Sequence, residues 1–191
     1  MSPSNPQTIL SFDAATSAGA VCALLGENGT SGWTTRASAL TYLIDDCVDD
    51  PQRIEGIVVG TGPGSFTSIR IALATARGLA LALGVPVAGS STIDAFTGGV
   101  PVIDARRGEV FSIGPCVCRP EELEVAGKVL VGDGALRYRD LFEAAGATIP
   151  ADERLHRPDP YALAEHAGPF GPVEDIQPLY LRDPDAKPST P

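Results

Sequence analysis

A buried strand, a glycine turn, a long apolar helix and a second buried strand follow one another in the first half of this sequence, and this order constrains the fold most. Ile57–Gly60 is wholly apolar, as expected for a strand at the centre of a sheet. Ser65–Leu83 repeats apolar or small residues at three- and four-residue spacing, which predicts the longest helix of the chain. Val85–Ala88 is the next buried strand. Helices that alternate with buried strands predict an α/β protein with a mixed sheet.

The residues around this unit predict three more strands and two more helices. Apolar alternation predicts strands over Thr8–Asp13 and Gly19–Leu25 and a third strand that includes Trp33. Ala37–Val48 has an apolar face at helical spacing, and Thr92–Thr97 is predicted to form a short helix. The resulting order, β-β-β-α-β-α-β-α, is similar to that of the RNase H-like half of actin-like ATPase folds.

A second, smaller lobe is expected to begin near Gly98. Its expected elements are strands over Val100–Asp104, Glu109–Cys118 and Val129–Val131, helices over Ala135–Ala145 and Pro160–Ala167, and an extended segment over Ile176–Leu181. We therefore expect an RNase H-like lobe over residues 1–97, a trimmed lobe over 98–182 and a disordered tail over 183–191. The predicted fold class is α/β, of the actin-like (ASKHA) type, with two small lobes of mixed β-sheet and flanking helices.

The charge of the chain limits which partners it can bind directly. Its 14 Lys and Arg against 24 Asp and Glu give a formal net charge of -10. Nucleic-acid binding draws most of its strength from basic groups that replace counterions at phosphates. The sequence therefore argues against a stand-alone nucleic-acid binder.

The chain has no recognisable export signal, so we expect a cytoplasmic protein. The start, MSPSNPQT, has neither a basic nor an apolar region of the kind a secretory signal needs. Ile71–Gly89 is apolar over a length near that of a membrane span, but Arg77, Gly84 and Pro86 interrupt it, and we expect no membrane insertion. The four cysteines lack the spacing of a disulfide framework, and the C-x-C pair does not make a zinc site.

The loop Gly60–Arg70 (GTGPGSFTSIR) joins the central strand to the long helix and is the most informative stretch for chemistry. Gly62 and Gly64 allow backbone conformations that other residues avoid, and the loop leads its amides into a helix N-terminus, where anions bind. It is neither a Walker A loop nor a dinucleotide fingerprint, because the Lys and the glycine spacing are missing. A tight strand-to-helix turn is the alternative reading.

The first hairpin resembles a phosphate-binding hairpin that has lost its glycines. In actin-like phosphotransferases an acidic residue is followed by Gly and Thr or Ser, whereas here Asp13 and Thr16 enclose two alanines. We therefore expect a vestigial phosphate loop rather than a working one. Its candidate residues are Asp13, Thr16, Gly62, Gly64 and Ser65.

Three carboxylates give a weaker hypothesis for a metal site. Asp13, Asp104 and Asp133 all follow predicted strands, so they are either Mg²⁺ ligands in a cleft or caps of turns, and the cap is the commoner role. No G-x-S-x-G elbow occurs, and neither His156 nor His166 has a nucleophile partner in sequence. We predict no catalytic residue and no metal site.

Several motifs resemble those of the TsaB (YeaZ) family, in the same order and over nearly the whole chain. They are FDAATS at 12–17, VGTGPGSFTSIRIALATARGLALAL at 59–83, the Ser-Ser-Thr start at 90–92, IDARRGEVF at 103–111 and PLYLRDPDA at 178–186. The resemblance implies a non-catalytic subunit of the machinery that makes N6-threonylcarbamoyladenosine (t6A) at position 37 of bacterial tRNA. It implies a heterodimer with the transferase TsaD, a ternary complex with the ATPase TsaE, and contact with tRNA only through the complex.

The resemblance also implies where the partner binds and what the chain lacks. In the family, the first two long helices pack against the same helices of TsaD, and Arg70 and Arg77 are candidates to pair with acids of the partner. The candidate interface residues are Leu40, Leu43, Ile69, Arg70, Leu73, Ala76, Arg77 and Ala80. TsaD holds its metal with an H-x-x-x-H motif, which this sequence lacks, so we expect no cofactor in the isolated chain and ATP with Mg²⁺ only through partners.

Some residues depart from the family pattern, and two other functions stay open. Ser68, Ala72 and Ala74 stand where glycines are common, which adds volume near the expected contact. An active enzyme, either an M22-type metallopeptidase or a small-molecule kinase, is one alternative. A homodimer through the same helices when TsaD is absent is the other.

Overall fold

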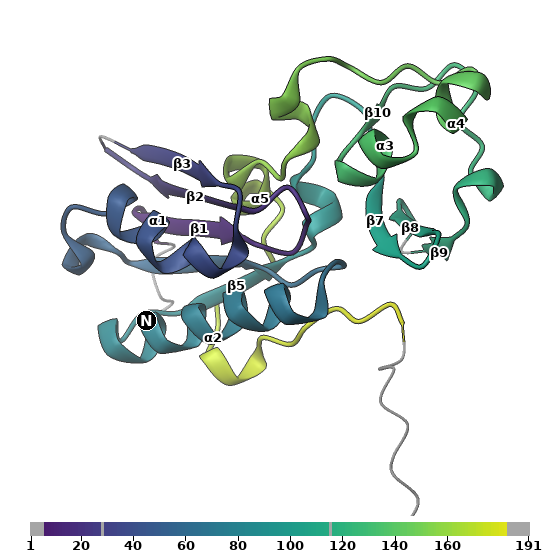
Figure 1. Ribbon diagram of the computed structural model, residues 1–191. Coiled ribbons are helices and arrows are strands. Elements are labelled where there is room, and N and C mark those ends of the chain that lie inside the picture. Colours follow the sequence, from purple (N-terminus) through teal and green to yellow (C-terminus); the bar gives the residue numbers. More distant parts are fainter. Residues whose placement is uncertain (1–5, 28, 115, 183–191) are drawn as a thin grey trace, which may run out of the picture.

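The computed structural model describes residues 6–27, 29–114 and 116–182, which form two lobes (Figure 1). Within these ranges the first lobe contains a five-stranded sheet in the order β3-β2-β1-β4-β5. Its strands are β1 (Ile9–Asp13), β2 (Ala20–Leu25), β3 (Thr30–Thr34), β4 (Gly56–Gly60) and β5 (Val87–Ser90). β2 is antiparallel to β1 and β3, whereas β4 is parallel to β1 and β5. The predicted mixed sheet is confirmed.

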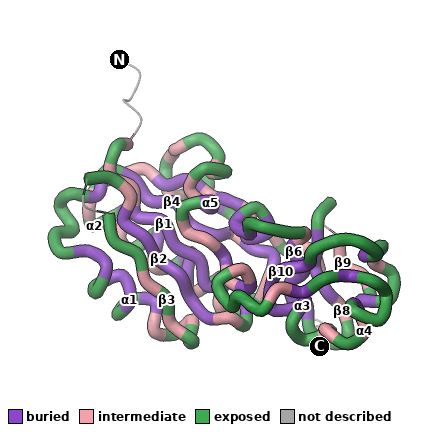
Figure 2. The backbone as a smooth tube through the Cα atoms, turned by 90° about the horizontal axis from the view of Figure 1, so that it is seen from above, coloured by how far each residue is buried: buried purple, intermediate pink, exposed green. Residues whose placement is uncertain are grey.

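Helices cover both faces of this sheet because successive strand residues point to opposite sides. On one face, α1 (Leu40–Cys47) and α2 (Phe66–Leu83) pack against Leu10, Phe12 and Val59. On the other, α5 (Pro160–Glu165) and a 3-10 turn (Thr92–Ala95) cover Val58 and Ala88. Figure 2 shows the resulting concentration of buried backbone in the strands.

The residues at the two ends of α2 explain where this helix begins and ends. Ser65 is the N-cap, and its hydroxyl oxygen accepts a hydrogen bond from the Ser68 N–H. Gly84 ends the helix in the left-handed conformation, with φ of 69°, a conformation that glycine adopts without strain. The first helix differs from its prediction, since Ala37–Ala39 form a 3-10 turn before α1 begins.

The second lobe consists of two small sheets and two short helices. The elements are β6 (Val100–Pro101), β7 (Ile103–Arg106), β8 (Glu109–Ser112), β9 (Cys116–Cys118), β10 (Leu130–Val131), α3 (Asp133–Arg137) and α4 (Arg139–Ala144). β7, β8 and β9 form an antiparallel sheet, and β10 pairs in parallel with β6. Val102, Val110, Leu130 and Phe142 lie at the core of this lobe.

The other 3-10 turns of the described residues, in both lobes and the C-terminal segment, are Pro51–Arg53, Pro120–Glu122, Glu153–His156 and Val173–Asp175.

Two predicted elements of the second lobe were wrong in length. The stretch 109–118 is not one strand but two antiparallel strands, because the chain reverses at Gly114, whose φ is 82°. The helix expected over 135–145 is divided at Tyr138, whose backbone leaves helical geometry with φ of -109° and ψ of 28°.

The expected extent of the second lobe, residues 98–182, was also wrong, because the chain returns to the first lobe at α5 (Pro160–Glu165). α5 packs against β1, β2 and β4, and the Ser11 hydroxyl donates to the Pro160 carbonyl over 2.7 Å. Beyond α5, the Leu179 N–H donates to the Thr61 carbonyl over 2.8 Å. The second lobe is therefore an insertion that ends before α5. The tail expected over 183–191 lies outside the described residues.

Candidate functional site

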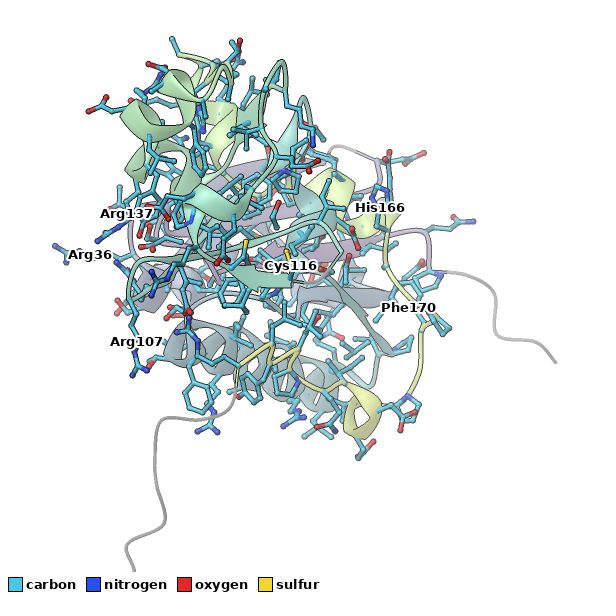
Figure 3. All side chains as sticks on the ribbon, turned by 90° about the vertical axis from the view of Figure 1, so that its right-hand side faces the viewer. Arg36, Arg107, Cys116, Arg137, His166 and Phe170 are labelled. Atoms are coloured by element: carbon cyan, nitrogen blue, oxygen red, sulfur yellow. The ribbon has the colours of Figure 1, made fainter. Side chains whose placement is uncertain are left out.

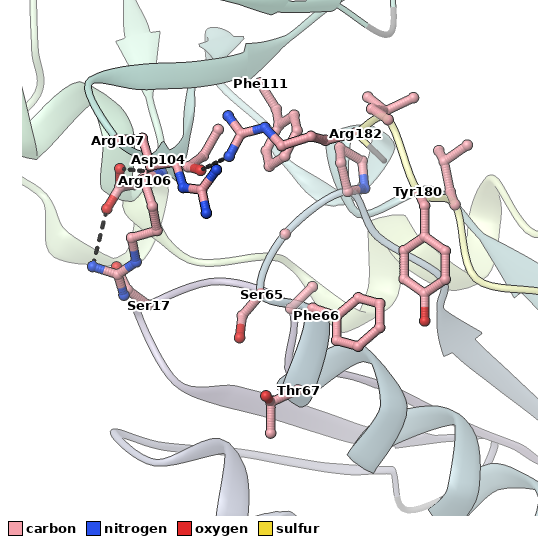
Figure 4. A pocket seen from close by; sticks show the side chains of 16 residues that line it. Ser17, Ser65, Phe66, Thr67, Asp104, Arg106, Arg107, Phe111, Tyr180 and Arg182 are labelled. Carbon is pink, nitrogen blue, oxygen red and sulfur yellow. Dashed lines mark hydrogen bonds and ion pairs between the residues drawn. The ribbon is translucent and has the colours of Figure 1, made fainter. Parts of the chain in front are cut away.

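A cavity of about 580 Å³ lies where the two lobes and the C-terminal segment meet (Figure 4). Four segments line it: the first hairpin (Ala15, Ser17), the loop into α2 (63–67), the β7–β8 turn region (104–107, Phe111) and the C-terminal segment (179–182). The structure thus brings together the glycine loop and the first hairpin, as the sequence predicted.

Two of the five residues predicted for a vestigial phosphate loop, Gly64 and Ser65, line this cavity. Asp13 does not: it is 1% exposed, and its carboxylate accepts hydrogen bonds from the Ala15 N–H and the Thr92 hydroxyl, both over 2.6 Å. Burial raises the pKa of the Asp13 carboxyl, and these two hydrogen bonds offset part of that rise.

Thr16 and Gly62 are buried and do not line the cavity either. The Thr16 hydroxyl has no hydrogen-bond partner within the described part of the chain. Only part of the predicted loop therefore lies at the cavity surface.

Backbone packing explains why the first hairpin offers so little to a ligand. The Ser65 N–H donates to the Ala15 carbonyl over 2.7 Å, and a Cβ added at Gly64 would lie only 2.2 Å from the same oxygen. The hairpin and the glycine loop therefore touch directly, and the glycine serves this close approach rather than an approach by phosphate.

The carboxylates of Asp13, Asp104 and Asp133, which were considered as metal ligands, accept hydrogen bonds from backbone N–H groups or pair with arginines. One oxygen of Asp133 accepts from the Ser17 N–H over 2.8 Å, and the other accepts from the Asp104 and Gly134 N–H groups. The carboxylate of Asp104 lies 3.2 Å from Arg106 and 3.5 Å from Arg137. Within the ranges that the structure describes, no three Asp, Glu, His or Cys side chains gather as a metal site would require.

Three arginines of the cavity were missed by the sequence analysis: Arg106, Arg107 and Arg182. Arg106 and Arg107 have left-handed backbone conformations, with φ of 64° and 56°. Arg107 and Arg137 lie on the same side of the molecule as Arg36 (Figure 3). The strands predicted on either side imply a turn over 105–108, but the sequence does not show the lobe arrangement that places Arg182 beside this turn.

The predicted partner interface is corrected for six of its eight residues, because these six are buried. All six lie in the core between helices and sheet, where a partner cannot reach them: Leu40, Leu43, Ile69, Leu73, Ala76 and Ala80. Arg70 and Arg77 are exposed. Arg70 lies over the Phe66 ring and donates to the Tyr180 hydroxyl over 3.1 Å, and Arg77 donates to the Ile176 carbonyl over 2.7 Å.

The opposite sides of α1 and α2 are free of contacts with the core. We call this surface the free helical face and define it by five exposed residues: Tyr42, Ala74, Gly78, Leu81 and Ala82. α2 is long and apolar enough to pass the length and composition test for a membrane span, and core helices of globular proteins pass the same test.

Comparison with known proteins connects this structure to tRNA modification. The profile of the family described as "TsaD: tRNA N6-adenosine threonylcarbamoyltransferase" matches residues 37–128. An uncharacterized protein of Mycobacterium tuberculosis is 33% identical, with 95% of this chain and 94% of that protein covered. The tRNA threonylcarbamoyladenosine biosynthesis protein TsaB of Escherichia coli is 30% identical, with 68% of this chain and 71% of that protein covered. This chain belongs to the TsaB family.

Solved structures agree with membership of the TsaB family. A Pseudomonas aeruginosa protein described as similar to the peptidase YeaZ superposes with a TM-score of 0.76 at 26% identity, covering 92% of this chain and all of that one. YeaZ of the same organism gives a TM-score of 0.74 at 25% identity. The predicted actin-like fold class is thereby confirmed.

Proposed function

We propose that this TsaB-family chain is the non-catalytic partner subunit of the machinery that makes t6A at position 37 of tRNA, and that it forms a heterodimer with a TsaD protein. Membership of the TsaB family supports a role in t6A synthesis, since the Escherichia coli relative carries that function in its name. The observation that carries the heterodimer is the free helical face, the exposed apolar and small residues of α1 and α2.

The free helical face has the chemistry of a helix-packing surface. Tyr42 is 76% exposed and Leu81 is 70% exposed, the highest values among the large hydrophobic side chains described. On α2, Ala74, Gly78 and Ala82 are exposed and small, so a partner helix can approach the α2 backbone closely. Exposed apolar surface of this kind marks protein–protein contacts. The bundle with TsaD then uses the outer sides of the two predicted helices.

Arg70 and Arg77 are exposed on α2, the helix that carries most of the free helical face. Arg70 and Arg77 already contact Tyr180 and Ile176 of the C-terminal segment. These contacts hold the guanidinium groups in place and leave them exposed, so acidic residues of TsaD can pair with them without a large loss of side-chain entropy.

The other members of the complex supply what this chain lacks. We infer that TsaE joins as the third protein, that ATP and Mg²⁺ enter through these partners, and that tRNA is held mainly by them. The net charge of -10 supports the last point, because 24 acidic residues oppose 14 basic ones. We place the complex in the cytoplasm.

The test is to mix the purified chain with TsaD of the same organism. We expect a 1:1 complex by size-exclusion chromatography with light scattering, and t6A formation that depends on the chain once TsaE, tRNA and threonylcarbamoyl-AMP are supplied. The proposal fails if no complex forms and t6A accumulates equally without the chain. Light scattering of the chain alone, over a range of concentrations, measures whether the same face forms a homodimer.

A further inference from the structure

The interlobe cavity is positively charged although the chain as a whole is acidic. Three arginines and one carboxylate, Asp104, are its only charged lining residues within the described ranges. The side chain of Asp104 is 2% exposed and is shared between Arg106 and Arg137, a fourth arginine just outside the cavity. Two more carboxylates contact lining residues, since Glu109 pairs with Arg182 and Asp133 accepts from Ser17. Four arginines therefore face three carboxylates at this site, in a protein with a net charge of -10.

The backbone of the β7–β8 turn is arranged so that two of these arginines stand at the cavity. A β-bulge lies between Asp104 and Arg106, and Arg106, Arg107 and Gly108 all have positive φ. A left-handed conformation costs a residue other than glycine roughly 1 kcal/mol or more. Bulges redirect side chains, and such strained positions gather at functional sites.

The arginines differ in how firmly they are held. Arg182 donates to the Ala105 carbonyl over 3.1 Å and pairs with Glu109, so it holds the turn in place. Arg106 is 62% exposed and pairs with Asp104 through one nitrogen. A guanidinium has five N–H donors, so Arg106 retains donors that can bind a second anionic group.

Apolar and aromatic side chains also line the cavity: Phe66, Phe111, Tyr180, Pro63 and Leu179. In Figure 4, Phe66 and Tyr180 lie across the cavity from Arg106 and Arg107, whereas Phe111 lies beside Arg182. A volume of about 580 Å³ lies in the range of small-molecule sites. A bare inorganic ion leaves most of this space and the apolar lining unused.

We propose that the interlobe cavity binds a small organic anion, with its phosphate or carboxylate at Arg106 and Arg107 and its apolar body against Phe66, Phe111 and Tyr180. The anion is recognised by the β7–β8 turn of the second lobe. The first hairpin, where the vestigial phosphate loop was expected, contributes only Ala15 and Ser17. This site is separate from the free helical face, and it stands whether or not the chain binds TsaD.

Isothermal titration of the isolated chain with three probes tests the proposal. Adenosine monophosphate carries phosphate on an apolar body, indole-3-acetate carries carboxylate on one, and inorganic pyrophosphate carries charge alone. We expect at least one of the first two to bind more tightly than pyrophosphate, and the tighter of the two identifies the anionic group. Binding should weaken as the salt concentration rises.

Variants and spectra locate the binding. We expect Arg106→Gln combined with Arg107→Gln to weaken binding at least about tenfold, because charge-assisted hydrogen bonds are lost. Arg154→Gln is the matched control, since Arg154 is an exposed, ion-paired arginine at a different groove. In the wild-type chain, amide NMR shifts should change at residues 63–67, 104–107 and 179–182, which tests the site even if the double variant folds poorly.

Three results would overturn the proposal. One is the absence of binding by both organic anions up to millimolar concentration. Another is equal loss of binding in the double variant and in Arg154→Gln. The third is NMR shift changes that avoid the three lining segments. None of these results affects complex formation with TsaD, so failure of this proposal is distinguishable from failure of the proposed function.

Discussion

The carboxylate of Asp133, in the second lobe, accepts hydrogen bonds from both the N–H and the hydroxyl of Ser17, in the first lobe. The other oxygen of Asp133 accepts from the Asp104 and Gly134 N–H groups over 3.1 and 3.0 Å. Asp133 is 8% exposed, so water competes little for these bonds. One side chain thereby connects the first hairpin to the strand end beside the cavity and sets how far apart the lobes stand.

Replacing Asp133 should therefore loosen the lobes as well as destabilise the fold. We expect Asp133→Ala to lower the free energy of unfolding by about 2–4 kcal/mol, because several buried N–H groups lose their acceptor. Ser17→Ala should cost about 1 kcal/mol, since the Ser17 N–H bond remains. Urea denaturation measures both effects, and small-angle scattering measures the lobe separation. Asp49→Ala, at an exposed position, is the control, and equal stability of the two Asp variants would contradict this role.

Leu81 and Tyr42 should determine binding to TsaD without affecting the fold. A Glu at either position places an unpaired charge in the proposed helix contact, so we expect Leu81→Glu and Tyr42→Glu to weaken the complex at least about tenfold. Their thermal midpoints should stay close to that of the wild type, because both side chains are exposed. Surface plasmon resonance against immobilised TsaD measures the affinity.

The matched control for these variants is Ile113→Glu. Ile113 is 59% exposed but lies in the second lobe, away from α1 and α2. If all three variants bind TsaD equally well, the complex does not use the free helical face. If Ile113→Glu alone disrupts it, the contact lies on the second lobe.

Sequence patterns predicted the first lobe well but assigned the core-facing side of α2 to the partner interface. β1, β2, β4 and β5 were predictable because they are apolar runs with residues buried on both faces of the sheet. α2 carries small or apolar residues on most sides, so Leu73 and Leu81 look equivalent in sequence, yet one is 4% and the other 70% exposed. Only the position of the sheet distinguishes them, and that position depends on contacts distant in sequence.

In the candidate site, too, the features set by neighbouring residues were predictable, and those set by contacts distant in sequence were not. Ser65 was predictable as a cap because the signal lies within four residues. The arginine cluster was not, since Arg182 reaches Ala105 across 77 positions of sequence and the left-handed backbone of Arg106 leaves no residue-type signal. The return of the chain to the first lobe at α5 was missed for the same reason.

Gly60 should tolerate no side chain. A Cβ built there lies 1.7 Å from the Asp13 carboxylate, inside the sheet between β1 and β5. We expect Gly60→Ala to lower the free energy of unfolding by about 3 kcal/mol or more, because the Asp13 side chain is buried and held by two hydrogen bonds and cannot move aside. Gly78→Ala is the matched control: nothing lies within 4 Å, and alanine favours the helix by about 1 kcal/mol. Opposite shifts of the thermal midpoint are the expected result, and a neutral Gly60→Ala would contradict the packing.

Asp13 should make the stability of the chain decrease as the pH rises. Its folded-state pKa is raised by burial from 3.8, so the folded state holds the proton more tightly than the unfolded state. The stabilising effect is fully present below pH 3.8 and is lost progressively as the pH rises through the higher folded-state value. Asn at this position can still accept from the Ala15 N–H and can donate to the Thr92 hydroxyl. Asp13→Asn should therefore remove the pH-dependent part of the stability while keeping both hydrogen bonds.

Urea denaturation of both proteins between about pH 4 and pH 8 isolates this effect, because every other group titrates in both. We expect the difference in unfolding free energy to move in favour of Asp13→Asn as the pH rises, and to level off once the folded-state pKa is passed. A constant difference across the range would show that the buried carboxyl titrates as an exposed one does.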